Sequence, residues 1–189
     1  MFDYIIVGAG SAGCLLANRL SVNPANRVCL IEAGPRDGFL IRNCNPLNML
    51  ALMKSRTYNW GYSAEPQART GNRRFFWPRG RALGGSSSIN AMIYTRGHPS
   101  DYDQWAARGN PGWDYQSVLP YFRCSERQQR GADAWHGAEG TMDVVDTNFR
   151  FPASSAFVQA CGEAGLPLNN DMNGAQQEGC GFFQVTQTP

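Results

Sequence analysis

The stretch FDYIIVGAGSAGCLLANRL, residues 2–20, decides the fold class of this 189-residue chain. Its first part, residues 2–7, is a short run with Tyr, Ile and Val before a glycine, which is typical of a buried parallel strand. A glycine-rich turn follows, and CLLANRL then has the apolar spacing of a helix. RVCLIE, residues 27–32, predicts a second strand. This order of elements predicts a Rossmann-like α/β unit with a parallel sheet over residues 3–34.

Three glycines in the turn have G-x-G-x-x-G spacing, and each has a physical role. Gly8 permits the tight turn out of the strand, Gly10 lets the backbone approach a pyrophosphate, and Gly13 lets the helix lie close to the sheet. The helix N-terminus offers free N–H groups to phosphates. Glu32 ends the second strand, where a carboxylate can accept hydrogen bonds from a ribose 2′-OH and would repel a 2′-phosphate. The pattern predicts a dinucleotide site and disfavours NADP, but it does not separate FAD from NAD.

Composition and charge exclude several other classes of protein. The formal net charge is +2, and no basic stripe is interleaved with aromatic residues, which argues against nucleic-acid binding. None of the six cysteines has C-x-x-C or zinc-ligand spacing, so we expect free thiols in a reducing compartment and no metal site. An acidic residue at position 3 and an apolar run broken by glycines argue against a signal peptide. No run approaches the roughly 20 apolar residues of a membrane helix, so a soluble protein is expected.

A second glycine-rich stretch, GRALGGSSSIN at residues 80–90, has two interpretations. Gly/Ser composition is typical of a flexible linker. Leu83 and Ile89 lie inside it, however, and no other Gly/Ser run is near. The alternative is a segment whose backbone approaches a ligand closely.

This stretch, extended as GRALGGSSSINAMIYTRGHPSDYD to residue 103, resembles the first signature of the glucose–methanol–choline (GMC) family of flavin oxidoreductases. EAG after the second strand and NWGYSAEPQ at 59–67 resemble the family as well, closest to its choline- and alcohol-dehydrogenase-like members. The resemblance implies a Rossmann-like FAD-binding domain, of which residues 1–140 are the N-terminal part. It implies that residues 141–189 begin an α+β substrate-binding domain, and that the chain is truncated relative to the family.

The resemblance also settles the cofactor as FAD and implies that residues 80–97 contact the flavin. Some members tether the flavin through a His where this chain has Ile89, so we expect non-covalent FAD. Of the arginines at 69, 73, 74, 79 and 81, only Arg81 is expected near the cofactor. The residues expected to bind FAD are Gly8, Gly10, Ser11, Ala12, Gly13, Glu32, Ala33, Trp60, Arg81, Leu83, Gly84, Gly85, Ser86, Asn90, Ala91, Met92 and Ile93.

The reaction implied by the family is hydride transfer from an alcohol carbon to flavin N5, which gives an aldehyde or ketone. Electrons then pass to O₂ or a quinone. The family's catalytic His pair is expected in a C-terminal remainder of the protein, so no catalytic residue is expected here. His98 and His136 have no partner at a telling spacing and are expected to be surface or capping residues. A cytoplasmic location is expected, and this expectation allows peripheral association with the inner membrane.

Two other functions compete with this one. The chain could be a flavin-binding module without turnover, or part of a different two-dinucleotide flavoenzyme such as a hydroxylase. The signature at 80–103 argues against the second.

The remaining elements expected are a short helix over 46–53, a capping box Ser100-x-x-Asp103 with a helix to Ala107, a helix over 115–126 bent or broken at Pro120, a loop over 131–140, a strand over 141–145 and a helix over 154–164.

Overall fold

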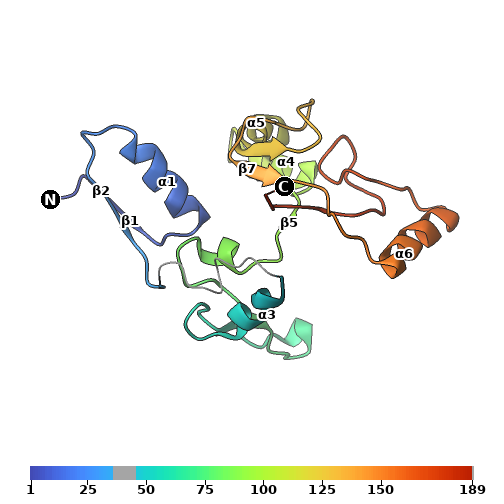
Figure 1. The fold of residues 1–189 in the computed structure, drawn as a ribbon, viewed down its shortest axis with the longest axis horizontal. Helices are drawn as coiled ribbons and strands as arrows, with labels where there is room; N and C mark the ends of the chain where they lie inside the picture. Colours follow the sequence, from blue (N-terminus) through green and yellow to red (C-terminus); the bar gives the residue numbers. More distant parts are fainter. Residues whose placement is uncertain (36–45, 189) are drawn as a thin grey trace. The chain divides into compact units, whose positions relative to one another are not determined.

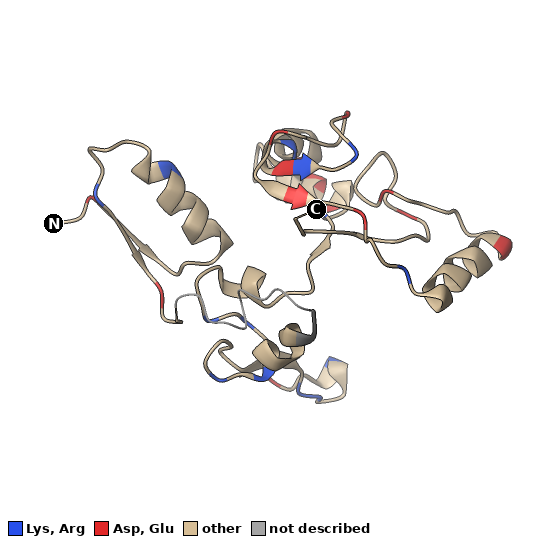
Figure 2. Ribbon diagram, viewed as in Figure 1, with Lys and Arg blue, Asp and Glu red and all other residues tan. Residues whose placement is uncertain are grey.

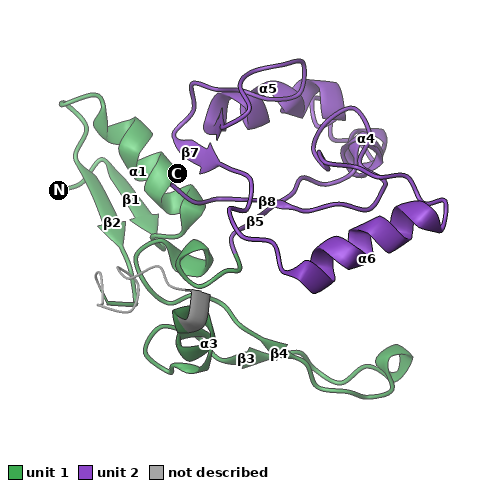
Figure 3. Ribbon diagram, turned by 45° about the vertical axis from the view of Figure 1, so that its right-hand side comes forward, with its two compact units in different colours: residues 1–91 green, residues 92–189 purple. Residues whose placement is uncertain are grey.

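The computed structural model describes residues 1–35 and 46–188 (Figure 1). These residues form two compact units, residues 1–91 and 92–189 (Figure 3). Each unit mixes short helices with pairs of strands. The fold is therefore α/β with parallel pairing, as predicted, and the functional boundary at residue 140 stays a prediction.

The first unit begins with the predicted strand–helix–strand motif. Strand β1 (Tyr4–Val7) pairs in parallel with β2 (Val28–Ile31), and helix α1 (Ser11–Ser21) connects them. The pairing runs from Tyr4 opposite Val28 to Val7 opposite Ile31. Figure 1 shows α1 packed along both strands. The Rossmann-like unit predicted from the sequence is confirmed.

The rest of the first unit contains elements that follow the residues left undescribed. Helix α3 (Pro46–Lys54) agrees with the predicted short helix. Strands β3 (Tyr62–Ser63) and β4 (Phe76–Trp77) form an antiparallel hairpin that the sequence did not predict. The described part of this unit also contains two 3₁₀ turns, η1 (Ala68–Thr70) and η2 (Gly85–Ser88).

The second unit is built on two separate strand pairs. Strand β5 (Ile93–Tyr94) pairs antiparallel with β8 (Gln184–Val185), and β6 (Glu126–Gln128) pairs in parallel with β7 (Met142–Val144). Its helices are α4 (Pro99–Ala107), α5 (Tyr115–Ser125) and α6 (Pro152–Glu163). The predicted helices and the strand near residue 143 are thus confirmed, with ends shifted by one or two residues.

Two local predictions in this unit were wrong. The capping box of α4 uses His98 and not Ser100: the His98 ring Nδ1 accepts from the Ser100 N–H at 3.3 Å, and Asp101 accepts from the His98 N–H at 2.9 Å. Pro99 favours this register because proline suits the first helical turn. Helix α5 continues through Pro120, so the predicted break is wrong, whereas a bend at Pro120 stays a prediction.

The β1–β2 pair leaves apolar side chains in solvent. Ile5 is 63% exposed, Val7 is 83% exposed and Ile31 is 49% exposed. A parallel sheet is normally covered on both faces, and its strands are apolar for that reason. The amino-acid composition of these two strands is therefore that of strands in the interior of a larger sheet.

Candidate cofactor site

The turn between β1 and α1 has the geometry that phosphate binding requires. Gly8 has a φ of 94°, a left-handed backbone that favours glycine. Gly10 is the N-cap of α1, no side chain caps the helix, and no acidic residue lies in its first turn. A methyl group on Gly10 would have no heavy atom within 4 Å. The helix N-terminus therefore offers N–H groups and positive potential on an open side of the turn.

The third glycine of the turn is held in close helix–strand packing. A methyl group on Gly13 would lie 1.9 Å from the Gly8 carbonyl oxygen and 3.4 Å from the Ile6 side chain. Only glycine fits such an approach of α1 to the end of β1. This is the packing role predicted for the last glycine of the spacing.

The second glycine-rich stretch packs directly on this turn. The Gly84 N–H donates to the Ala9 carbonyl at 2.7 Å, and Gly10 and Gly84 form an isolated β-bridge. A methyl group on Gly85 would lie 2.8 Å from the Gly10 Cα. Residues 80–90 are therefore an integral part of the site and not a linker.

Glu32 ties the end of β2 to the first glycine turn and to Gly34. Its Oε2 accepts from the Ala9 N–H at 2.8 Å, and its Oε1 accepts from the Gly34 N–H at 2.8 Å. Gly34 in turn lies against the chain at Arg81, because a methyl group on it would be 2.1 Å from the Arg81 carbonyl oxygen. Each carboxylate oxygen keeps further lone-pair capacity. The contact of Glu32 with a ribose stays a prediction.

Arg81 differs from the other arginines of its segment. Those at 69, 73, 74 and 79 are exposed, whereas Arg81 is half-buried with its guanidinium 5.2 Å from the centre of the Trp60 ring. Its Nε is buried and has no hydrogen-bond partner among residues 1–35 and 46–188. Arg81 and Trp60 line a cavity of about 630 Å³, to which Lys54 and Arg56 add positive charge. The Trp60–Arg81 pair was placed near the cofactor by resemblance, and the structure brings its two members together.

The remaining predicted residues divide between the two units. Leu83, Ser86, Asn90 and Ala91 are exposed in the first unit, as are Ser11 and Ala12 at the start of α1 and Ala33 after β2. Met92 and Ile93 belong to the second unit. There the Met92 carbonyl accepts from the Thr186 N–H at 2.8 Å, and Ile93 pairs with Val185. The roles of all these residues in FAD binding stay predictions.

The sequence interpretation of His136 was wrong. His136 is 3% exposed, its Nδ1 lies 2.8 Å from Glu126 Oε1, and its Nε2 lies 3.0 Å from Asp171 Oδ2. The partners are 10 and 35 residues away along the chain, so spacing gave no signal. His98, by contrast, is the capping residue that was expected.

His136 belongs to a buried, charged network. The Arg96 guanidinium donates to the Glu126 carboxylate and to the Trp135 carbonyl, and Gln128 also donates to Glu126. Figure 2 shows acidic and basic residues together on β6 and β7, where a partly exposed pair, Arg127 and Asp143, adds to the buried one. Each charged member has a partner of opposite sign, so removal of one of them would leave a buried charge uncompensated.

The hydrogen bonds of this network also set the proton affinity of the ring. Burial alone would lower the pKa of His136, but hydrogen bonds to Asp171 and Glu126 outweigh it and raise that pKa to about 9. The hydrogen bond from His136 lowers the pKa of Asp171. A histidine held protonated between two carboxylates is a poor general base at neutral pH.

The described part of the chain contains no group of three or more His, Cys, Asp or Glu residues arranged to hold a metal ion. None of its helices has the length and apolarity needed to cross a membrane.

The glycine turn at a helix N-terminus, closed by the second glycine segment and tied to a strand-terminal acid, defines a dinucleotide-binding α/β protein. More specifically, the chain belongs to the GMC oxidoreductase family, whose sequence model matches residues 2–188. Proteins of this family are flavoproteins that use FAD. The resemblance found in the sequence is thereby confirmed.

Relatives of known activity and structure cover nearly the whole chain. It is 50% identical to an alcohol dehydrogenase [acceptor] of Pseudomonas putida over 99% of the chain and 34% of the relative. It is 44% identical to the mitochondrial choline dehydrogenase of Mus musculus over 98% of the chain and 32% of the relative. The crystal structure of pyridoxine 4-oxidase from Mesorbium loti has a TM-score of 0.88 at 38% identity, covering 100% of the chain and 37% of that protein. The chain thus spans about a third of the length of these relatives.

Proposed function

We propose that this chain supplies the N-terminal part of the FAD site of an oxidoreductase that converts an alcohol to an aldehyde or ketone. The observation that carries the proposal is the packing of Gly84 and Gly85 on the Gly8–Gly13 turn. The names of the relatives, alcohol dehydrogenase and choline dehydrogenase, support a CH–OH donor as the substrate class. In the same proposal, the electrons pass to O₂ or a quinone. The proposed location is cytoplasmic.

The residues present fit the cofactor. The open side of Gly10 and the uncapped start of α1 suit a pyrophosphate, because backbone N–H groups there lack a side-chain partner. Glu32 would accept from the ribose and fixes the turn at the same time. Arg81, whose buried Nε has no partner among the described residues, would hold an acceptor group nearby. FAD, when bound, supplies the hydride acceptor of the reaction.

The described histidines do not supply the base that an alcohol oxidation needs. His98 caps α4, and His136 is held between two carboxylates. We therefore place proton removal in the remainder of a longer protein, where the family resemblance implies a His pair. The 189 residues alone are proposed to bind FAD weakly or not at all and to oxidise no alcohol, since the apolar β1–β2 pair would be covered by further strands in the complete protein.

The first test is Gly10→Ala in the complete protein. The added methyl group meets no atom of the described residues and the backbone φ of −75° suits alanine, so the melting temperature of the FAD-free protein should be unchanged. If a pyrophosphate occupies that space, overpacking should weaken FAD binding by about 1–3 kcal/mol, or about 5- to 150-fold in Kd. The measurement is FAD titration followed by flavin fluorescence. Ser21→Ala, at the other end of α1, is the control and should bind FAD as the unmodified protein does.

The outcome of this test separates the cofactor from the fold. An unchanged Kd with an unchanged melting temperature would show that no phosphate of FAD lies at this turn, which would contradict the proposal.

Non-covalent attachment gives a second test. Ile89 is 3% exposed and apolar, so it can neither bond to the flavin nor donate to it. Acid precipitation of the complete protein should release all yellow flavin into the supernatant. Flavin that stays in the washed pellet would show a covalent bond at another residue.

A further inference from the structure

The second unit contains a cavity of about 380 Å³, formed by α6 and by segments that precede and follow that helix. Two arginines, Arg130 and Arg150, line it together with the apolar side chains of Val158, Leu168 and Phe182. None of the described residues that line the cavity is acidic. The cavity therefore combines positive charge with an apolar wall.

The charge of Arg130 is already compensated. Its Nε lies 3.1 Å from Asp146 Oδ2 and its Nη2 lies 2.7 Å from Asp146 Oδ1, which is a bidentate pair. Its Nη1 donates to the Asn170 carbonyl at 2.8 Å. Burial would raise the pKa of Asp146, but hydrogen bonds from Arg130 and Gln184 outweigh it and lower that pKa. Asp146 is therefore an anion at neutral pH, and Arg130 shapes the wall without adding net charge.

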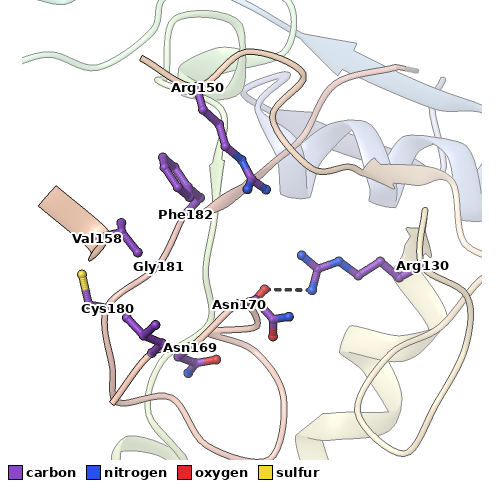
Figure 4. Close-up of a pocket in the computed structure, with 9 residues that line it drawn as sticks. Arg130, Arg150, Val158, Asn169, Asn170, Cys180, Gly181 and Phe182 are labelled. Carbon is purple, nitrogen blue, oxygen red and sulfur yellow. Dashed lines mark hydrogen bonds between the residues drawn. The ribbon is translucent and has the colours of Figure 1, made fainter. Parts of the chain in front are cut away.

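Arg150, by contrast, has no ion pair or hydrogen bond within residues 1–35 and 46–188. Its guanidinium lies 4.5 Å from the centre of the Phe182 ring, and it acts on Asp146 only through space. Figure 4 shows the guanidinium groups of Arg130 and Arg150 extending toward the same space, with the Phe182 ring beside Arg150. One cation with free N–H donors thus faces a partly apolar cavity.

We propose that this cavity binds a small organic carboxylate, whose anionic end lies at Arg150 and whose apolar body lies against Phe182 and Val158. A planar guanidinium binds a carboxylate through two parallel N–H···O bonds, so an arginine without a partner suits this group. Arg130 does not take that role, because it is already paired. The volume of about 380 Å³ is near the lower end of the range for small-molecule pockets, roughly 300–1,000 Å³, so the ligand is small.

The exposure of the site decides which part of the ligand supplies affinity. Arg150 is exposed, and Leu168 is 61% exposed, so a ligand can enter from solvent. An ion pair at an exposed position contributes little by itself. Burial of an apolar body against the cavity wall has to add to it. The site should therefore distinguish an organic carboxylate from an inorganic anion.

Calorimetric titration of the complete protein with three probes tests this assignment. Benzoate carries both the charge and an apolar body, benzamide has the same shape without the charge, and inorganic phosphate has charge without an apolar body. We expect saturable binding of benzoate and binding of the other two that is weaker by about tenfold or more. Absence of saturable benzoate binding, or equal binding of benzamide or phosphate, would overturn the proposal.

A pair of variants tests the role of Arg150. Arg150→Gln should weaken benzoate binding about 5- to 20-fold, because a charge-assisted pair at a partly exposed site contributes less than a buried one. The melting temperature should change little, since no hydrogen bond to the described residues is lost. Arg108→Gln, which removes the same charge from an exposed position after α4, is the control and should bind benzoate as the unmodified protein does. Full benzoate affinity in Arg150→Gln, or an equal loss in Arg108→Gln, would overturn the proposal.

Alkylation of cysteine gives a second measurement that places the ligand. Cys180 lines the cavity, whereas Cys124 is exposed on α5. Benzoate should slow the reaction of Cys180 with iodoacetamide, a neutral reagent, and leave the rate at Cys124 unchanged. Mass spectrometry of the two cysteine-containing peptides measures both rates in one sample. Equal rates at Cys180 with and without saturating benzoate would show that benzoate binds elsewhere, which would contradict the assignment.

Discussion

Gly13→Ala is expected to destabilise the first unit by about 1–3 kcal/mol and to strip FAD from the complete protein. The new methyl group would lie 1.9 Å from the Gly8 carbonyl oxygen and 3.1 Å from its carbonyl carbon. Both are backbone atoms of the turn that leaves β1, so no side chain can rotate to relieve the overlap. Helix α1 would have to move away from β1 and would carry its N-terminus out of position.

Melting temperature and flavin content, measured together, check this result. Gly10→Ala is the matched control, because it adds the same methyl group three residues earlier where nothing lies within 4 Å. In the FAD-free protein we expect Gly13→Ala to lower the melting temperature and Gly10→Ala to leave it unchanged, whereas both variants should lose flavin. A Gly13→Ala protein that melts like the unmodified one would show that α1 and β1 are not in such close contact.

The strand–helix–strand motif could be predicted because its signals are local. The apolar run of β1, the glycine spacing and the helical periodicity of α1 all lie within 20 residues. The contact of Gly84 with Gly10 joins residues 74 positions apart, and no periodicity encodes it. Resemblance to a family, and not the residues alone, indicated that residues 80–90 approach a ligand.

Elements made by long-range pairing were missed for the same reason. Strands β5 and β8 are two residues long and pair across some 90 positions, so neither carries a strand pattern of its own. Glu126 was expected to end a helix, but it begins β6 and is fully buried. A buried carboxylate is tolerated there only because Arg96 and His136 come from other parts of the chain to meet it.

The network at Glu126 also predicts how stability changes with pH. Raising the pH from about 6.5 to about 9 is expected to lower the free energy of unfolding of the second unit by on the order of 3 kcal/mol. The pKa of His136 is about 9 in the folded chain, against an ordinary value of 6.5. Below 6.5 both states hold the proton and the stabilisation is complete. Between the two values only the folded state holds it, so each rise in pH favours unfolding.

Urea denaturation at a series of pH values, followed by tryptophan fluorescence, measures this dependence, and Trp135 beside His136 is a suitable probe. His136→Gln is the control, because an amide can donate to Glu126 or Asp171 but does not titrate. The variant should lose the pH dependence assigned to the ring, and the raised pKa of Cys180 lowers stability only above its ordinary value of 9.0, outside this window. The lowered pKa of Asp171 affects stability only in acid, where protonation of its carboxylate removes a partner of the ring. Equal slopes for the two proteins between pH 6.5 and 9 would mean that His136 is not held protonated by its two carboxylates.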